Sequence, residues 1–210
     1  MTSLLTQVIS THGWSCPSVS GFVLSLPTPP PPSFSLNDPA SHATQGFPCL
    51  NIGTSLTPSQ GTANFDNIRQ RHIEIGTYEA LVQSLPPPYG KSCDYILFTQ
   101  DCSHFVFAEL KVFKSRKNKN PRAQLRQSLR DVWSTASSRF SNCPNKWCCL
   151  FKRIPVTVNT APSITAVSAF NSMNTLTAVS QSGIKTADAD MNASSFEFWV
   201  FTNDQRCQLN

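Results

Sequence analysis

Residues 93–112, CDYILFTQDCSHFVFAELKV, constrain the fold more than any other stretch of this chain. Two runs of strand-forming residues flank a short polar segment, TQDCS, whose Asp and Ser favour a turn. The pattern predicts a β-hairpin. Charged side chains stand near its open end, where a buried sheet would ordinarily carry apolar ones: Asp94, Glu109 and Lys111.

Side chains alternate between the two faces of a strand, which divides the second run into two sets. One face carries Phe105, Phe107, Glu109 and Lys111, and the other carries Val106, Ala108, Leu110 and Val112. The second face is wholly apolar and suited to packing on a helix. Because the strands of a hairpin run antiparallel and the turn is centred near residues 101–102, Asp94 should lie opposite Glu109. The sequence therefore predicts two carboxylates and an ammonium group at one end of a sheet.

Two close carboxylates repel each other unless a proton or a cation lies between them. Mg²⁺ accepts two carboxylates and completes its coordination with water and phosphate oxygens, and Mn²⁺ favours similar oxygen ligands. An adjacent lysine stabilises charge on a phosphate or helps to position and deprotonate a water. This equipment is typical of metal-assisted phosphodiester hydrolysis. The alternative is a surface salt bridge between Glu109 and Lys111, with Asp94 as an ordinary residue at a strand start.

The flanking segments predict an α/β fold, a small mixed β-sheet flanked by helices. Residues 67–88 indicate a helix in their second half, which Pro86 to Pro88 end. A second helix should begin at Pro121 behind an Asn120 cap, and its apolar stripe contains Leu125, Leu129, Val132, Trp133, Ala136 and Phe140. A buried strand, KWCCLFKRI, follows. Residues 160–195 favour irregular structure with one short helix, and residues 195–202 favour a further strand.

Over residues 67–155 the chain resembles the PD-(D/E)XK nuclease superfamily, which has the restriction-endonuclease-like fold. The resemblance implies that Asp94 is the first metal-binding acid and that Glu109 and Lys111 form the acid-x-Lys element on the next strand. It also implies a catalytic glutamine on the following helix, which Gln124 matches. Glu79, on the preceding helix, is a weaker match to an additional metal ligand of some members.

The chain departs from the family pattern at two positions. Cys93 stands where the first motif has its proline, and Arg126 follows the helical Gln-Leu pair without the downstream tyrosine of one subtype. The resemblance implies a metal-dependent endonuclease that uses Mg²⁺ or Mn²⁺ to cleave nucleic acid, with DNA as the expected substrate. The alternative is a catalytically inactive nucleic-acid-binding or assembly protein on the same fold.

Basic residues are concentrated where a nucleic acid would meet this site. Residues 111–130 hold eight of the 17 Lys and Arg residues, starting at Lys111. The other seven are expected to contact backbone phosphates: Lys114, Arg116, Lys117, Lys119, Arg122, Arg126 and Arg130. A solvated basic loop is the alternative for such a run of charge.

The first 66 residues differ in composition from the rest, with no Lys or Arg and four consecutive prolines at residues 29–32. We expect residues 1–66 to be a poorly ordered, proline-rich leader and residues 67–210 to form the nuclease-like domain. Two alternatives remain: the leader binds an aromatic-lined groove of a partner protein, or it packs on the domain through Trp14, Phe22, Phe34 and Phe47.

The sequence favours a cytoplasmic protein that does not insert into a membrane. It has no apolar run of about 18 residues and no basic N-terminal signal segment. Its eight cysteines lack the paired spacing of a structural zinc site, and we expect Cys148 and Cys149 to be buried, reduced side chains. Whether the protein acts alone or as a homodimer is left open.

Overall fold

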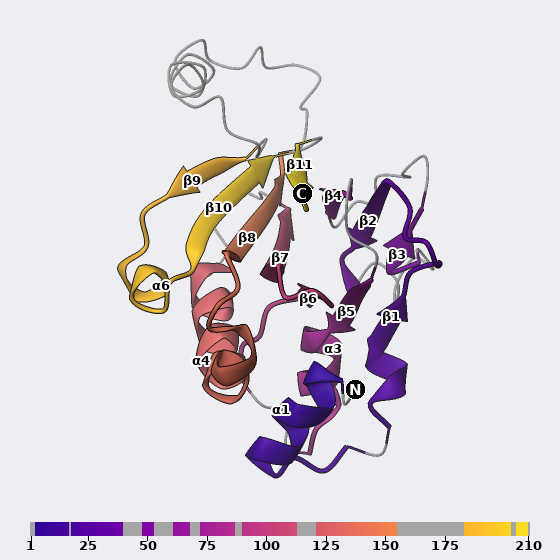
Figure 1. Cartoon of the computed structure of the whole chain (residues 1–210), viewed down its shortest axis with the longest axis vertical. Coiled ribbons are helices and arrows are strands. Elements are labelled where there is room, and N and C mark those ends of the chain that lie inside the picture. The colour runs from indigo at the N-terminus through magenta and orange to yellow at the C-terminus, as the bar shows by residue number, and fades with distance from the viewer. Residues whose placement is uncertain are drawn as a thin grey trace.

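The computed structural model describes residues 3–16, 18–39, 48–52, 61–67, 72–86, 90–112, 121–154, 183–202 and 205–209. Its helices are α1 (Leu4–His12), the 3₁₀ turn η1 (Ser20–Phe22), α3 (Tyr78–Ser84), α4 (Pro121–Phe140) and α6 (Ala189–Ala193). Its strands are β1 (Val23–Ser25), β2 (Ser33–Asn37), β3 (Leu50–Asn51), β4 (Thr62–Asp66), β5 (Ile73–Thr77), β6 (Tyr95–Thr99), β7 (His104–Val112), β8 (Asn145–Arg153), β9 (Ile184–Thr186), β10 (Glu197–Thr202) and β11 (Arg206–Gln208). Figure 1 labels them along the chain.

A seven-stranded mixed sheet forms the centre of the molecule, in the order β1-β5-β6-β7-β8-β10-β9. The predicted hairpin is its middle: β6 pairs antiparallel with β7. On the other side of β7, β8 runs parallel, and α4 makes the crossover between them. The α/β class and the mixed sheet are therefore confirmed, together with the helix that begins at Pro121.

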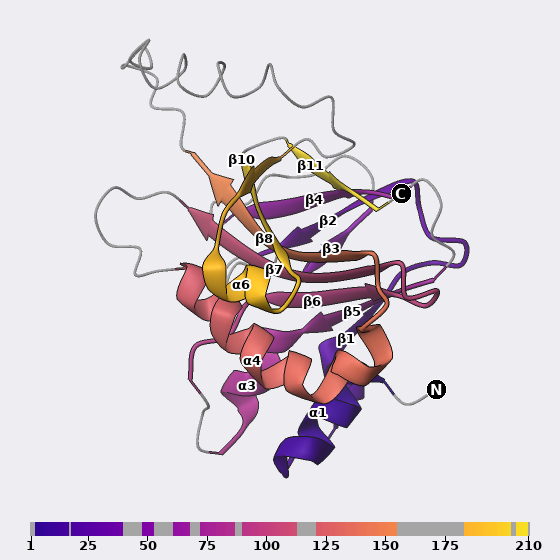
Figure 2. The ribbon, with the colours of Figure 1, turned by 60° about the vertical axis from the view of Figure 1, so that its left-hand side comes forward.

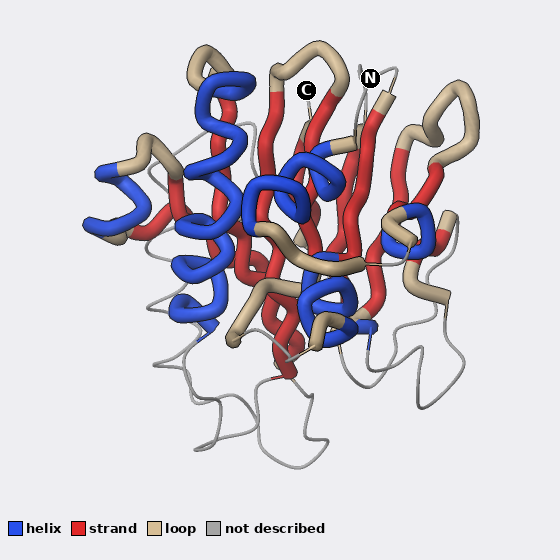
Figure 3. Tube along the Cα trace, turned by 90° about the horizontal axis from the view of Figure 1, so that it is seen from below, coloured by secondary structure: helices blue, strands red, loops and turns tan. Residues whose placement is uncertain are grey.

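A second sheet of four strands, β11-β4-β2-β3, covers one face of the central sheet, and helices cover the other. Figure 2 shows the three layers, with β4 and β2 above the central strands and α1, α3 and α4 below them. Seen from the helical side in Figure 3, the helices lie in front of the strands, and the longest of them runs along the strand direction. Two apolar cores result, one between the sheets and one under the helices.

The two faces of β7 pack against different layers from those predicted. Val106, Ala108 and Leu110, expected to pack on a helix, belong to the core between the two sheets. Phe105 and Phe107 belong to the core beneath the helices. The charged face of the hairpin is therefore the one that the helices cover, and Glu109 is buried there, on the side of β7 that α4 packs against.

The prediction of a poorly ordered leader is wrong for the described part of residues 1–66. Helix α1 buries Leu4, Leu5, Val8 and Ile9 in the helix-side core. It approaches the sheet closely at Gly76 of β5, where a Cβ atom would lie 2.9 Å from Leu5 Cδ1. Strand β1 pairs with β5, and β2 and β4 build the second sheet.

The leader therefore packs on the domain, as one of the two alternatives supposed. Of the four aromatic residues proposed for this packing, Phe34 is buried, Trp14 and Phe22 are partly buried against the core, and Phe47 lies outside the described residues. The strand-forming character of residues 33–37 and 62–66 is hidden in sequence by their small and polar side chains, such as Ser35 and Asn64, which hydrogen bond to each other.

Candidate active site

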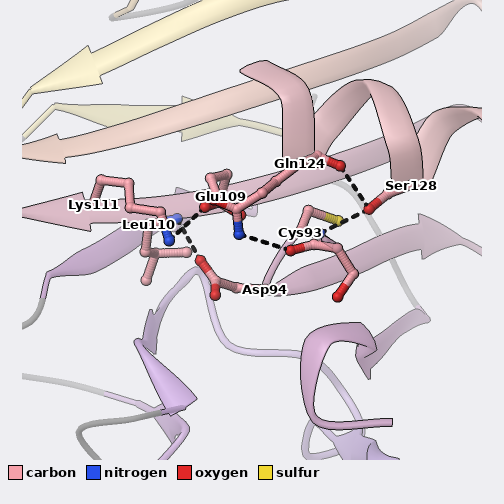
Figure 4. A network of polar contacts seen from close by, with 8 residues as sticks. Cys93, Asp94, Glu109, Leu110, Lys111, Gln124 and Ser128 are labelled. Carbon is pink, nitrogen blue, oxygen red and sulfur yellow. Dashed lines mark hydrogen bonds and ion pairs between the residues drawn. The ribbon is translucent and has the colours of Figure 1, made fainter. Parts of the chain in front are cut away.

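The start of β6 and the end of β7 bring the two predicted acids together. Tyr95 is paired with Ala108, so Asp94, one residue before β6, lies across from Glu109. The Leu110 N–H donates a hydrogen bond of 2.6 Å to Asp94 Oδ2, which fixes the carboxylate against β7. The predicted convergence at one sheet end is confirmed, and Figure 4 shows both side chains on the same side of the hairpin.

Lys111 completes the cluster because it lies two residues beyond Glu109 on the same face of β7. Its Nζ is 2.6 Å from Glu109 Oε1. The Lys111 side chain is 26% exposed, whereas that of Glu109 is fully buried. Of the two paired side chains, Lys111 is therefore the one that an anion in solvent can contact.

Burial perturbs all three charges. Burial raises the pKa of Asp94 well above its usual value, and the neighbouring carboxylates of Glu109 and Glu79 add to this, while Lys111 opposes it. Burial also raises the pKa of Glu109 to about 7, again against the stabilising charge of Lys111. The two carboxylates in turn raise the pKa of Lys111 although its own burial acts in the opposite sense. The raised pKa values mean that this pair of acids favours a bound proton or a bound cation.

Gln124, in the first turns of α4, reaches toward the strand that carries Asp94. Its Nε2 donates a hydrogen bond of 3.0 Å to the Ser92 carbonyl. One turn later, Ser128 Oγ accepts a 2.7 Å hydrogen bond from the Cys93 N–H and donates one of 3.0 Å to the Gln124 carbonyl. These contacts tie α4 to the residues that immediately precede Asp94 (Figure 4).

Ser128, which is fully buried, is a site residue that was not predicted from the sequence. The signal was present, because Ser128 interrupts the apolar stripe of α4 next to Leu129. A lone hydroxyl on a buried helix face needs a partner, and here the partner is the backbone beside the site. The Cys93 thiol, at the position where the family pattern has proline, is buried and directed toward the Tyr95 carbonyl at 3.4 Å.

Glu79 lies in the first turn of α3, whose Tyr78 N–H donates 2.9 Å to the Asp94 carbonyl. It is close enough to Asp94 to raise that residue's pKa. Within the described parts of the chain, however, no three His, Cys, Asp or Glu side chains form a group arranged to hold a metal ion. Asp94 and Glu109 are thus brought together as predicted, whereas Glu79 stands near them without completing a three-ligand set.

The donor set fits a hard divalent cation that keeps much of its water. Asp94 Oδ1 and Glu109 Oε2 are buried and accept no well-formed hydrogen bond from the described residues. A buried carboxylate oxygen without a donor is unfavourable, and a cation would satisfy it. Mg²⁺ is commonly bound through one or two carboxylates, with water and substrate phosphate supplying the other ligands.

The residues predicted to contact phosphate lie in different settings. Lys114, Arg116, Lys117 and Lys119 lie outside the described residues. Arg126 pairs with the buried carboxylate of Asp188 at 2.7 Å and with Asp190 at 3.2 Å, so its charge serves to attach α4 to α6. The Arg122 guanidinium lies over the Phe198 ring, 4.8 Å from its centre. Arg130 is exposed and remains a candidate.

The pairing of Arg126 has a clear electrostatic signature. Burial acts to raise the pKa of Asp188, but hydrogen bonds from Arg126 and the Met191 N–H outweigh it and lower the pKa. An arginine held in this way has less charge to offer a phosphate. The row of three arginines predicted along α4 is therefore not a uniform anion-binding face.

No family model, curated protein or solved structure matches this chain. Within the described residues, no helix combines the length and apolar character needed to span a membrane. Any function proposed for this chain therefore rests on the geometry of the site.

Proposed function

We propose that this protein is a metal-dependent endonuclease of the PD-(D/E)XK type that hydrolyses phosphodiester bonds of nucleic acid, with DNA as the expected substrate. The observation that carries the proposal is the convergence of Asp94, Glu109 and Lys111 beneath α4, with Gln124 hydrogen bonded to the backbone beside them. Such a cluster of buried acids with perturbed pKa values is characteristic of functional sites.

The arrangement of elements supports a restriction-endonuclease-like core. The first acid precedes one strand of an antiparallel hairpin, the acid-x-Lys element lies on the second strand, and the glutamine lies on the helix that follows. This is the order that the resemblance implies. A cytoplasmic setting also belongs to the proposal, because all eight cysteines are free thiols, as expected where thiols stay reduced.

In the proposed reaction the chain's own groups have separate roles. Asp94 and Glu109 would hold Mg²⁺ or Mn²⁺ between strands β6 and β7. The bound ion would polarise the phosphate and lower the pKa of a water molecule. Lys111, partly exposed beside Glu109, would place positive charge on the scissile phosphate or position the attacking water. Gln124 and Ser128 would keep α4 and the Asp94 strand in register, because both contact backbone groups directly before Asp94.

A catalytically inactive nucleic-acid-binding protein on the same fold is the second candidate. The ion pair between Lys111 and Glu109 favours it, since a structural salt bridge would occupy the same two side chains. The two candidates differ in what Lys111 contributes. In an enzyme, Lys111→Ala abolishes cleavage and leaves most of the nucleic-acid affinity, because one contact among many basic residues is a small part of the electrostatic attraction.

The test is cleavage of supercoiled plasmid, linear duplex and single-stranded substrates across a Mg²⁺ and Mn²⁺ series by wild type, Glu109→Gln and Lys111→Ala. Lys185→Ala is the control, because it removes one lysine that pairs with an exposed acid, Glu197, on the outer strands β9 and β10. Cleavage by wild type and the control, with loss in both site variants, is expected. Equal cleavage by wild type and Lys111→Ala would refute a catalytic role for Lys111, and binding without cleavage by wild type would favour the second candidate.

A further inference from the structure

A second lysine stands beside the proposed site in a position that the sequence did not single out. Lys152 of β8 is the direct Cα partner of Lys111 in the parallel pair β7–β8. Paired residues of neighbouring strands direct their side chains to the same face of a sheet. Cys148 and Leu150, which precede Lys152 on alternate positions, belong to the core beneath the helices. Lys152 is therefore on the face that carries Glu109 and Lys111.

Strand β8 repeats the lysine of β7 without repeating its acid. On β7, Glu109 lies two residues before Lys111 and forms an ion pair with it. The corresponding residue of β8, two positions before Lys152, is the apolar Leu150, which is the Cα partner of Glu109. Lys152 is half-buried, and none of the described residues forms an ion pair with it. By contrast, the described partners of Lys185 and Arg206 are carboxylates on neighbouring strands.

Like charges directly opposite each other on neighbouring strands destabilise a sheet. Although Glu109 offsets part of the Lys111 charge, two ammonium groups at the end of β7 and β8 repel each other in the free protein, and an anion between them would remove the repulsion. The backbones of adjacent strands are only about 4.8 Å apart. Two lysine side chains starting at that spacing can both reach one phosphate, with N···O distances of about 2.8 Å.

We infer that Lys152 is a phosphate-binding residue of this site: with Lys111 it holds one phosphodiester group of the substrate from two sides. Lys111 shares its charge with Glu109, while Lys152 gives its charge to the phosphate alone. The inference rests on the proposed function for the identity of the ligand, a nucleic-acid phosphate. It adds a contact from β8, outside the acid-x-Lys element.

The test compares wild type with Lys152→Met, which keeps the apolar stem and removes the charge, and Lys152→Arg, which restores it. Lys146→Met is the matched control, because Lys146 lies on the same strand and face but at the other end of β8, beside Trp133. Binding of a short labelled duplex is measured in EDTA over a salt series, and cleavage is measured with Mg²⁺ or Mn²⁺. Circular dichroism establishes that each variant is folded.

Loss of one phosphate contact should reduce the slope of log K against log salt by about 0.9 in Lys152→Met. Loss of a hydrogen bond to a charged group should reduce kcat/KM roughly 10- to 100-fold. Lys152→Arg should recover most of the binding slope, and Lys146→Met should match wild type in both assays. Such a pattern supports the inference.

The remaining outcomes separate the two proposals. If wild type cleaves and Lys152→Met equals Lys146→Met in slope and rate, the inference is overturned while the proposed function stands. If wild type binds but does not cleave, and only Lys152→Met loses slope, the nuclease proposal fails and Lys152 is still a phosphate contact. If wild type neither binds nor cleaves nucleic acid, both are overturned.

Discussion

Replacing Glu109 by Gln should stabilise the protein at alkaline pH while removing its proposed activity. The carboxyl of Glu109 is fully buried, and its pKa is raised from 4.5 to about 7. A carboxyl that binds its proton more tightly in the folded state makes folding less favourable as pH rises from its unfolded pKa to its folded one. The penalty is absent below pH 4.5, grows between pH 4.5 and pH 7, and is complete above it.

The magnitude follows from the size of the pKa shift. Each pKa unit corresponds to about 1.4 kcal/mol, so a rise from 4.5 to about 7 amounts to roughly 3 kcal/mol above neutral pH. Gln lacks the ionisation and keeps the shape, and the raised pKa of Glu109 already includes the stabilising charge of Lys111. The expected stabilisation of Glu109→Gln at pH 8 is therefore about 3 kcal/mol, or a Tm increase of roughly 6–12 °C for a chain of this size.

The assay is thermal and urea unfolding of both proteins in metal-free buffer from pH 4.5 to pH 8. Glu197→Gln is the control, because Glu197 is partly exposed and pairs with Lys185 at the surface. The difference between Glu109→Gln and wild type should widen with pH, and that of the control should not. Mg²⁺ should raise the Tm of wild type and leave Glu109→Gln nearly unchanged. A difference that stays constant or shrinks as pH rises would refute the argument that burial makes the ionisation of Glu109 unfavourable.

Two further changes test how the site is supported. Gly76→Ala should lower the free energy of unfolding by about 1–3 kcal/mol in urea, because the added methyl group would press on Leu5 of α1. Gly21→Ala is the control and should have a much smaller effect, because there is open space around Gly21. Equal effects of the two substitutions would argue against close packing of α1. Ser128→Ala should lower the free energy of unfolding by about 1–3 kcal/mol, because it leaves the buried Cys93 N–H without its acceptor. Hydrogen exchange at the Cys93 amide should accelerate. Unchanged exchange would show that this hydrogen bond is dispensable.

The sequence was most informative where interactions are local. The hairpin of β6 and β7 follows from alternation of residue types across a short turn, and its register places Asp94 opposite Glu109 without knowledge of the rest of the chain. Helix α4 likewise shows its buried stripe in its own sequence. The convergence of Asp94, Glu109 and Lys111 was therefore predictable, since all three come from one supersecondary unit.

Distant pairings escaped the sequence argument for a physical reason. The partner of Arg126 is Asp188, 62 residues further on, and no periodic pattern links the two. Alternation identified two faces of β7 but did not show which layer would cover each, because both faces carry large apolar residues. The strands at residues 33–37 and 62–66 were not predicted because their sequences mix small and polar residues, and polar pairs such as Ser35 with Asn64 form only once the second sheet has assembled.

The second sheet joins segments that are far apart in the sequence, and this has a consequence for synthesis on the ribosome. Strand β11 pairs parallel with β4, with Cys207 beside Phe65, and both residues are fully buried. Leu110, on the reverse side of the strand that carries Glu109 and Lys111, packs in the same core. A nascent chain therefore cannot complete the layer behind β7 until Arg206–Gln208 has left the exit tunnel, and the acid pair acquires its full backing only after translation has passed that point.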